Sequence, residues 1–290
     1  MADRPRGPDG IVVVDKPAGW TSHDVVARSR KVLGTRKVGH SGTLDPDATG
    51  VLVLGVGRAT RLLRYLTPLP KRYTATIVLG TETTTLDAAG EVTAVHDMSG
   101  VVQDDVWRAA RQLTGDIEQV PPMFSAVKVG GRRLHEIARE GGEVERAPRP
   151  VTVHRFDVTP TADPQIWKAD VECSSGTYVR TLAADLGTSL GGGAHLTGLR
   201  RLSVGSFTID GARSMDSPEL LPPAAGVRHL AGLVVDAELA VDVGYGKVLD
   251  RQRLGTEGDG PWAVHDADGI LLAVYEPYED RTKPAVVLVG

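Results

Sequence analysis

The sequence predicts an α+β fold, in which a mixed or mostly antiparallel sheet with flanking helices precedes a small C-terminal β domain. Strand-like and helix-like segments interleave irregularly, and several strands form hairpin-like pairs, which favours α+β over a regular alternation of parallel units. A cluster of prolines and a glycine between residues 217 and 228 indicates a boundary. We therefore expect a disordered lead (1–9), a large domain (10–222) and a small domain (229–290).

The elements of the large domain are predicted from hydrophobic patterns, a helix cap and glycine stops. Thr21 and Asp24 have capping-box spacing, so a helix should begin there, end near Leu33 before Gly34, and bury Val32 on its inner side. Alternating or β-branched runs predict strands at residues 11–14, 51–56, 73–79, 151–156 and 167–173. Apolar spacing predicts further helices at residues 59–66, 104–113 and 177–186.

The small domain should consist of short strands at residues 233–235, 262–265, 270–275 and 285–289, separated by Gly and Asp turns. Its charge differs from that of the rest of the chain. Residues 231–290 carry 5 Lys and Arg against 11 Asp and Glu, whereas the remaining 230 residues carry 28 basic and 26 acidic side chains. This acidic charge argues against a contact between the small domain and a polyanionic partner, and a domain that mainly packs against the large one is the alternative.

Composition limits the class of protein. The 290 residues are 41% hydrophobic, and no apolar run approaches the roughly 20 residues that span a bilayer. The N-terminal residues lack the apolar core of a signal peptide, so we expect a cytoplasmic protein without a membrane partner. Cys173 is the single cysteine, and the eight histidines show no metal-ligand spacing, so we expect neither a metal nor a cofactor.

The most informative segment is the loop from Gly39 to Gly50, which combines three glycines, a proline, a histidine and two carboxylates before an apolar run. Such glycine density allows close approach of the backbone to another group, and catalytic residues concentrate in loops held by rigid elements. Asp45 is the candidate catalytic residue, because Pro46 restricts it to extended conformations.

Two other interpretations fit this loop from its residues alone. Asp-Pro and Asp-Ala-Thr-Gly are also ordinary turn sequences, which is the simpler account of Asp47 and Thr49. Residues 45–49 also match D-x-D-x-T, the nucleophile signature of magnesium-dependent haloacid-dehalogenase-type phosphatases. In those enzymes the first Asp ends a buried hydrophobic strand, whereas residues 39–44 are rich in glycine and polar side chains.

The loop as a whole resembles the catalytic-aspartate motif of the TruB family of tRNA pseudouridine synthases, G-H-x-G-x-L-D-P-x-A-x-G-x-L. Five other segments resemble motifs of the same family in the same order. They are the D-K-P-x-G-x-T-S entry at residues 14–22, K-R-Y at 71–73, P-P-x-x-S-A-x-K at 121–128, G-T-Y-I-R-x-L-A at 176–183 and A-x-L-x-x-L-R-R at 194–201. Six matches in register over residues 11 to about 210 are far more specific than any one of them.

The resemblance implies a pseudouridine-synthase fold with a PUA-like C-terminal domain, and the isomerisation of uridine 55 in the T-loop of tRNA by base flipping. Asp45 matches the essential carboxylate and Arg180 the arginine that pairs with it. Tyr73, Tyr178 and Leu199 match residues around the flipped base. His40 matches a histidine placed against the T-loop.

Several cations in the basic clusters of the chain are expected to have supporting roles. Lys16 is expected to brace the entry loop near the site. Candidate contacts to the RNA backbone are Arg58, Arg61, Lys71, Lys128 and Arg132. The implied partner is the T-arm of tRNA, with no obligate protein partner. A non-catalytic tRNA-binding or tRNA-folding protein is the remaining alternative, and the presence of Asp45, Tyr73 and Arg180 argues against it.

Overall fold

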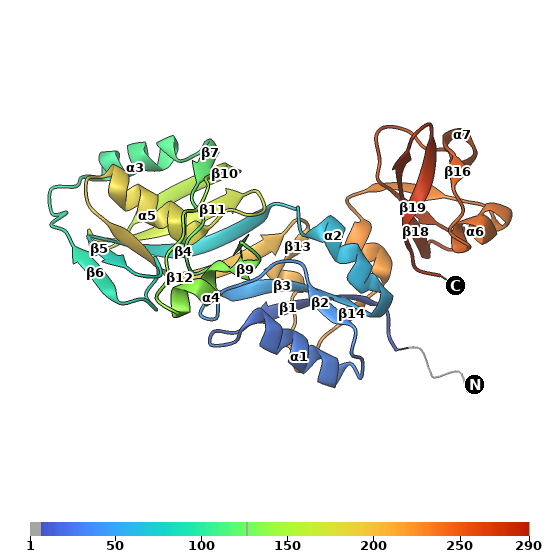
Figure 1. Cartoon of the computed structure of the whole chain (residues 1–290), viewed down its shortest axis with the longest axis horizontal. Coiled ribbons are helices and arrows are strands. Elements are labelled where there is room, and N and C mark those ends of the chain that lie inside the picture. The colour runs from blue at the N-terminus through green and yellow to red at the C-terminus, as the bar shows by residue number, and fades with distance from the viewer. Residues whose placement is uncertain (1–6, 126, 290) are drawn as a thin grey trace.

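A computed structural model describes residues 7–125 and 127–289 of the chain. An elongated ten-stranded sheet forms the body, and a separate five-stranded sheet lies at the C-terminal end (Figure 1). The main path through the large sheet is β14 (Leu220–Leu221), β1 (Gly10–Lys16), β3 (Thr49–Val56), β12 (Ala194–Val204), β4 (Lys71–Leu79), β11 (Ile166–Cys173), β10 (Arg149–Pro160) and β7 (Gly115–Gln119). Two short strands extend it, β2 (Val38–His40) beside β3 and β13 (Phe207–Thr208) beside β12. The predicted α+β fold is therefore confirmed.

The sheet is mixed, and its one parallel pair of named strands among the described residues positions the site. β12 pairs parallel with β3, with Arg200 opposite Thr49 and Arg201 opposite Gly50. On its other side β12 pairs antiparallel with β4, which places Arg201 opposite Tyr73. The loop before β3 and the start of β4 are thus brought together by a strand that the sequence analysis did not predict.

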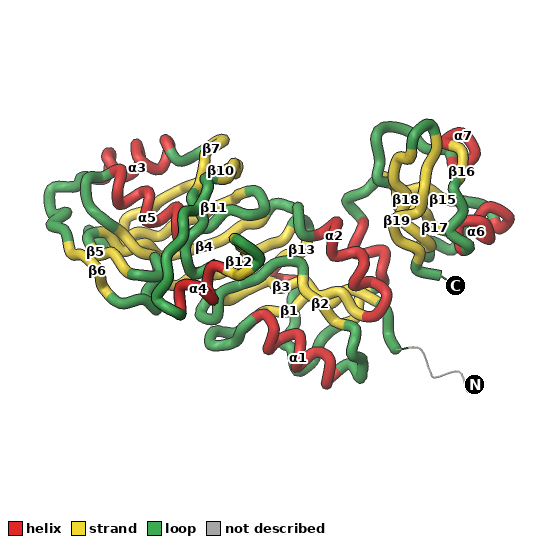
Figure 2. Tube along the Cα trace, viewed as in Figure 1, coloured by secondary structure: helices red, strands yellow, loops and turns green. Residues whose placement is uncertain are grey.

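Helices pack over two separate hydrophobic clusters of this sheet (Figure 2). α1 (Ser22–Val32) packs on β1 and β3, and its predicted capping box is present, with Thr21 and Asp24 bonded reciprocally. The prediction that Val32 is buried was wrong, because its side chain is 38% exposed near the end of the helix. α3 (Gln103–Gln112) and α5 (Val179–Ser189) cover β4, β10 and β11.

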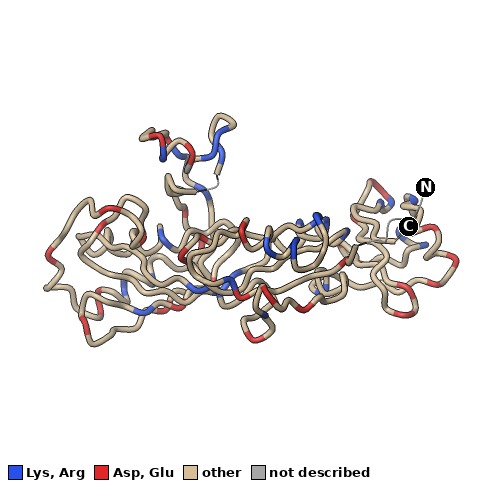
Figure 3. Tube along the Cα trace, turned by 90° about the horizontal axis from the view of Figure 1, so that it is seen from below, with Lys and Arg blue, Asp and Glu red and all other residues tan. Residues whose placement is uncertain are grey.

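Shorter elements connect these layers. A 3₁₀ turn, η1 (Gly57–Leu62), runs into α2 (Leu63–Leu66) where one short helix was expected. Two hairpins leave the sheet. They are β5 (Thr81–Thr83) with β6 (Val92–Val95), and β8 (Lys128–Val129) with β9 (Arg132–Arg133), which leads into α4 (Leu134–Arg139). The segment with β8, β9 and α4 projects from the body and carries several cations (Figure 3).

The C-terminal unit has a strand near each of the four predicted ones and a fifth, β16 (Leu249–Asp250), that was not predicted. Their order in the sheet is β15 (Ala231–Val234), β17 (Trp262–His265), β18 (Leu271–Tyr278), β19 (Arg281–Val287) and β16. The unit also has two helices that were not predicted, α6 (Ala237–Gly244) and α7 (Arg251–Leu254). Its core is built around the fully buried Trp262 and Tyr275. The connection to it is packed rather than loose, since β14 pairs with β1 and the 3₁₀ turn η3 (Pro223–Val227) buries Val227.

The ends of the chain are described in part. Residues 1–6 of the predicted lead lie outside the described residues. Asp9 forms an ion pair with Arg58 at 2.8 Å and so fixes the end of the lead against the body. Within residues 7–125 and 127–289, no helix combines the length and apolar character needed to cross a membrane.

Candidate active site

The Asp45 loop is held on both sides of Asp45 by buried polar side chains. The hydroxyl of Ser22 accepts from the Leu44 amide at 2.9 Å and donates to the Leu44 carbonyl at 3.2 Å. On the other side, the Pro46 carbonyl accepts from Lys16 Nζ at 2.8 Å and from the Gly19 amide at 3.0 Å. Lys16 is fully buried, and burial lowers its pKa to about 8. Lys16 Nζ also donates to the carbonyls of Pro17 and Trp20, and so joins the entry loop to the Asp45 loop.

The far end of the loop depends on a glycine. Gly50 has φ of +102°, and a Cβ there would lie 2.1 Å from the Arg201 carbonyl oxygen. Only glycine allows β12 to pack this closely against the start of β3. Because β12 carries Leu199 and Arg201 to the loop, this close approach sets the position of the loop within the site.

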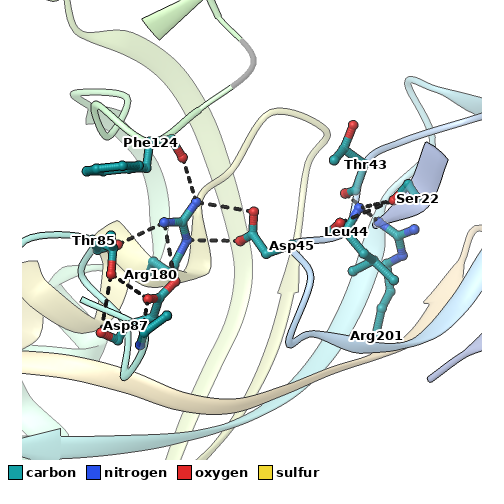
Figure 4. A network of polar contacts seen from close by, with 10 residues as sticks. Ser22, Thr43, Leu44, Asp45, Thr85, Asp87, Phe124, Arg180 and Arg201 are labelled. Atoms are coloured by element: carbon teal, nitrogen blue, oxygen red, sulfur yellow. Dashed lines mark hydrogen bonds and ion pairs between the residues drawn. The ribbon is translucent and has the colours of Figure 1, made fainter. Parts of the chain in front are cut away.

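Arg180, on the first turn of α5, reaches back to Asp45 (Figure 4). Its Nε lies 3.0 Å from Asp45 Oδ2 and its Nη2 lies 3.3 Å from Oδ1, a two-pronged contact that fixes the plane of the carboxylate. The Arg180 side chain is 6% exposed and that of Asp45 is 40% exposed. The cation is thus buried behind the carboxylate, whose other side remains open.

Three further acceptors hold Arg180 in place. Its guanidinium donates to the carbonyls of Thr85 at 2.8 Å and Phe124 at 2.9 Å, and it lies 3.4 Å from Asp87 Oδ2. Asp87 itself accepts from Thr85 Oγ1 at 2.5 Å and from the Ala89 amide at 3.1 Å. The sequence analysis missed Asp87, although residues 85–87 repeat the Thr-Leu-Asp of residues 43–45.

The pKa of Asp45 reflects opposing effects. Burial raises it above the ordinary 3.8, Arg180 lowers it, and the neighbouring carboxylate of Asp87 raises it again. The net direction is upward. Arg180 therefore offsets only part of the cost of placing a carboxylate in this site.

Two cavities meet at the Asp45–Arg180 pair. The larger has a volume of about 860 Å³ and the smaller about 250 Å³. Asp45, Arg180 and Leu199 line both. The arrangement suits a molecule whose body occupies the larger cavity and whose reacting group enters the smaller one.

Comparison with known proteins agrees with this geometry. The family model "TruB family pseudouridylate synthase (N terminal domain)" matches residues 30–179, just over half of the chain. The chain belongs to the TruB family. Two further models match later segments, "tRNA pseudouridylate synthase B C-terminal domain" at residues 180–223 and "tRNA Pseudouridine synthase II, C terminal" at residues 231–289.

Curated TruB relatives are similar along nearly their whole length. A tRNA pseudouridine synthase B from Nocardia farcinica (strain IFM 10152) is 50% identical over 291 residues, covering 96% of this chain and 93% of the relative. One from Streptomyces coelicolor (strain ATCC BAA-471 / A3(2) / M145) is 46% identical, covering 99% of each. A solved chain from a Cbf5-Nop10-Gar1 complex is 26% identical with a TM-score of 0.68, covering 97% of this chain and 84% of that one.

The structure brings together the residues that the resemblance to TruB had singled out. Tyr73, Tyr178 and Leu199 line the smaller cavity with Asp45 and Arg180. Tyr73 is buried, and burial raises the pKa of its hydroxyl.

The histidine expected against the T-loop lies apart from that group. His40 lines the larger cavity, where its ring lies edge-on to that of His23 with centroids 5.5 Å apart. Burial is the main cause of a lowered pKa at His40, so this imidazole is mostly neutral at neutral pH.

The cations that were predicted to contact the RNA backbone differ in exposure and in their partners within the protein. Arg58 is paired with Asp9, Arg61 donates to the Val287 carbonyl in the C-terminal unit, and Lys71 is buried. These three have partners within the protein, and their role as phosphate contacts stays a prediction. Lys128 and Arg132 are exposed on the projecting hairpin, where Arg132 lies 2.6 Å from Glu140.

Two cations outside the predicted set, Arg133 and Arg139, line the larger cavity. They come from the same projecting segment as Lys128 and Arg132. The sequence could have indicated them, because they belong to a cluster of basic residues beside the P-P-x-x-S-A-x-K segment. Ala126 of that segment lies outside the described residues.

The phosphatase alternative does not fit the strand arrangement. Asp45 lies between β2 and β3, which pair antiparallel, and not at the end of a buried parallel strand. Within the described part of the chain, no group of three or more His, Cys, Asp or Glu side chains is arranged to hold a metal ion.

Proposed function

We propose that this protein isomerises uridine 55 in the T-loop of tRNA to pseudouridine. The observation that carries the proposal is the Asp45 carboxylate, which is held rigidly by Arg180 at the junction of two cavities and is open on its other side. The family models and the names of the curated relatives support a tRNA uridine as the substrate.

The two cavities suggest how the RNA binds. The base to be rebuilt must leave its stack, at a cost of a few kcal/mol, to reach a buried side chain. The smaller cavity would receive the uracil, which Tyr73 would stack upon, while the larger cavity would hold the T-loop against His40. Arg133 and Arg139, with Lys128 on the same segment, would contact phosphates.

The chemistry needs one carboxylate. The N1–C1′ bond breaks, the uracil turns, C5 forms a bond to C1′, the proton on C5 leaves, and N1 takes up a proton. Asp45 would attack C1′, attack C6 of the base, or help to remove a ribose proton, and Arg180 would hold it in position for each of these steps. Tyr73 is placed to contact the base throughout.

The test is tritium release from tRNA labelled at uridine C5, in the presence of EDTA. Wild type should release tritium and Asp45→Ala should release none, while both bind tRNA. Asp47→Ala is the matched control, because it removes an exposed carboxylate from the same loop and should keep most of the rate.

Each of the other outcomes would contradict a different part of the proposal. Tight tRNA binding without release by wild type would favour the non-catalytic binding protein. Release by Asp45→Ala at the wild-type rate would show that Asp45 is not the catalytic carboxylate. Release at a position other than uridine 55, mapped after carbodiimide treatment, would reject the T-loop assignment.

A further inference from the structure

Two buried cations flank Tyr73 in the smaller cavity. Lys71 and Tyr73 are two residues apart on β4, and both are buried while Arg72 between them is exposed, so they share one face of the sheet. Arg201 lies opposite Tyr73 on the neighbouring strand β12. All three side chains line the smaller cavity.

Neither cation is neutralised by a carboxylate. Lys71 is 6% exposed, and its ammonium donates to the carbonyls of Thr67 at 2.5 Å and Leu69 at 2.6 Å. Arg201 is 1% exposed, and its guanidinium donates to the carbonyls of Val51 at 2.7 Å, Gly42 at 3.1 Å and Thr43 at 3.3 Å. Among the residues that the structure describes, neither of them forms an ion pair.

This arrangement is costly for the fold. A buried charge is strongly unfavourable unless a counter-charge compensates it, and neutral carbonyls satisfy the hydrogen bonds without removing the net charge. Arg180, which lines the same cavity, lies near the carboxylates of Asp45 and Asp87. In contrast to Arg180, Lys71 and Arg201 leave their positive potential beside Tyr73 without a compensating ion pair from any described residue.

The two charges also act on each other. Burial lowers the pKa of Lys71 to about 8, and the positive charge of Arg201 contributes in the same direction. Lys71 is thus still mainly protonated at neutral pH. An anion placed between the two groups would relieve their repulsion.

We propose that Lys71 and Arg201 form an anion site that stabilises the negative charge carried by the uracil during the rearrangement. This rests on the proposed function. When the N1–C1′ bond breaks, its electron pair remains on N1, and the charge spreads over N1, O2 and O4 of the detached base. C1′ is then bonded to the Asp45 carboxylate, or is part of the double bond left when a ribose proton is lost.

Attack of Asp45 on C6 also places a negative charge on the base that must be stabilised. If Asp45 attacks C6, the electron pair of the C5–C6 double bond moves onto O4, and the base again becomes anionic. In each case the charge is absent from bound uridine and develops as the reaction proceeds. Cations fixed in a water-poor cavity therefore stabilise the transition state more than the bound substrate.

The experiment compares a uridine with a 5-fluorouridine at the target position of otherwise identical tRNA. Fluorine withdraws electron density from the ring, so the 5-fluorouracil anion needs less help from the protein. Consumption of the target nucleoside is followed under single-turnover conditions by digestion and mass-detected chromatography. Lys71→Met removes the charge, Lys71→Gln removes it but keeps a donor for the two carbonyls, and Lys71→Arg keeps the charge.

We expect Lys71→Met and Lys71→Gln to slow uridine consumption by about 100-fold, the scale for one preorganised charge-stabilising group. Consumption of 5-fluorouridine should slow by less than about tenfold, since part of that stabilisation is no longer needed. Lys71→Arg should restore most of the uridine rate. Arg72→Met is the matched control, because Arg72 is the next residue on β4 and pairs with Asp170 outside the cavity; it should leave both rates unchanged.

Other results would overturn the proposal. Equal slowing of both substrates would make Lys71 a structural residue, and an unchanged uridine rate would remove it from the reaction. If Lys71→Met does not fold, as judged by its circular dichroism and melting curve, Lys71→Gln gives the same comparison. Failure of the wild type to consume either nucleoside would instead refute the proposed function.

Discussion

Replacement of Arg180 by methionine tests the central contact of the site. The change leaves a side chain of similar length but removes the donors that bind Asp45, Thr85 and Phe124, together with the charge near Asp87. Two carboxylates are then left near each other without their cation. Breaking a buried ion pair from one side costs about 3–5 kcal/mol of folding free energy.

The expected effects follow from these contacts. A loss of about 3–5 kcal/mol should lower Tm by roughly 6–20 °C, since each kcal/mol shifts Tm by roughly 2–4 °C at this chain length. Without the cation, the already raised pKa of Asp45 should rise further. Together with the loss of orientation, this should reduce single-turnover tritium release by at least about 1,000-fold.

Arg180→Lys separates charge from geometry. A lysine keeps the positive charge but is a single point donor, so it cannot bind both Asp45 oxygens and the two carbonyls at once. We expect it to recover most of the Tm and little of the rate. The reasoning fails if Arg180→Met, folded and binding tRNA, releases tritium within tenfold of wild type, or if Arg180→Lys restores the full rate.

Three other predictions follow from the geometry. The proposed reaction requires ionised Asp45, and the pKa of Asp45 is raised. The rate should therefore fall as pH decreases through a midpoint above the ordinary 3.8. A pH–rate profile with its midpoint at or below 3.8 would contradict the role of Asp45. In an Asp45→Ala background, Tyr73→Leu should weaken tRNA binding by about 1–3 kcal/mol through lost stacking, whereas Tyr73→Phe should bind as before. Filter binding measures both variants, and an equal loss of affinity in Tyr73→Leu and Tyr73→Phe would exclude the stacking role. Arg139→Ala should reduce the magnitude of the slope of log tRNA affinity against log salt concentration by about 1. Arg58→Ala, which breaks an ion pair with Asp9, should lower Tm and leave that slope unchanged.

Local signals in the sequence predicted much of this fold. The capping box at Thr21 and Asp24 uses groups three residues apart, and β17 was predicted with its observed bounds from its apolar residues and flanking turns. β12 was not predicted as a strand, because Arg200 and Arg201 interrupt any apolar alternation. Arg201 is buried only because β12 lies between β3 and β4, and that position depends on residues more than a hundred positions away.

The basic residues show the same limit for binding sites. Arg58 and Arg61 were expected to face RNA because they lie close together in the sequence with other cations. Asp9, which pairs with Arg58, is 49 residues away, and the Val287 carbonyl, which binds Arg61, is 226 residues away. A cluster of cations in the sequence records the charge but not which charges are already bound within the protein, so it could not distinguish Arg58 from Arg139.

Asp45 and Asp87 show why the sequence could point to a candidate catalytic residue but not to its partner network. Both follow Thr-Leu, and both contact Arg180. Asp87 Oδ1 also accepts from Thr85 Oγ1 and from the Ala89 amide, so its own turn holds one of its oxygens, while Oδ2 faces Arg180. Among the described residues, the Asp45 carboxylate forms hydrogen bonds and ion pairs with Arg180 alone, and it lines both cavities. The two carboxylates therefore differ in their further partners and in their access to the smaller cavity, which Asp45 lines and Asp87 does not. Both differences are decided by tertiary packing rather than by the motif.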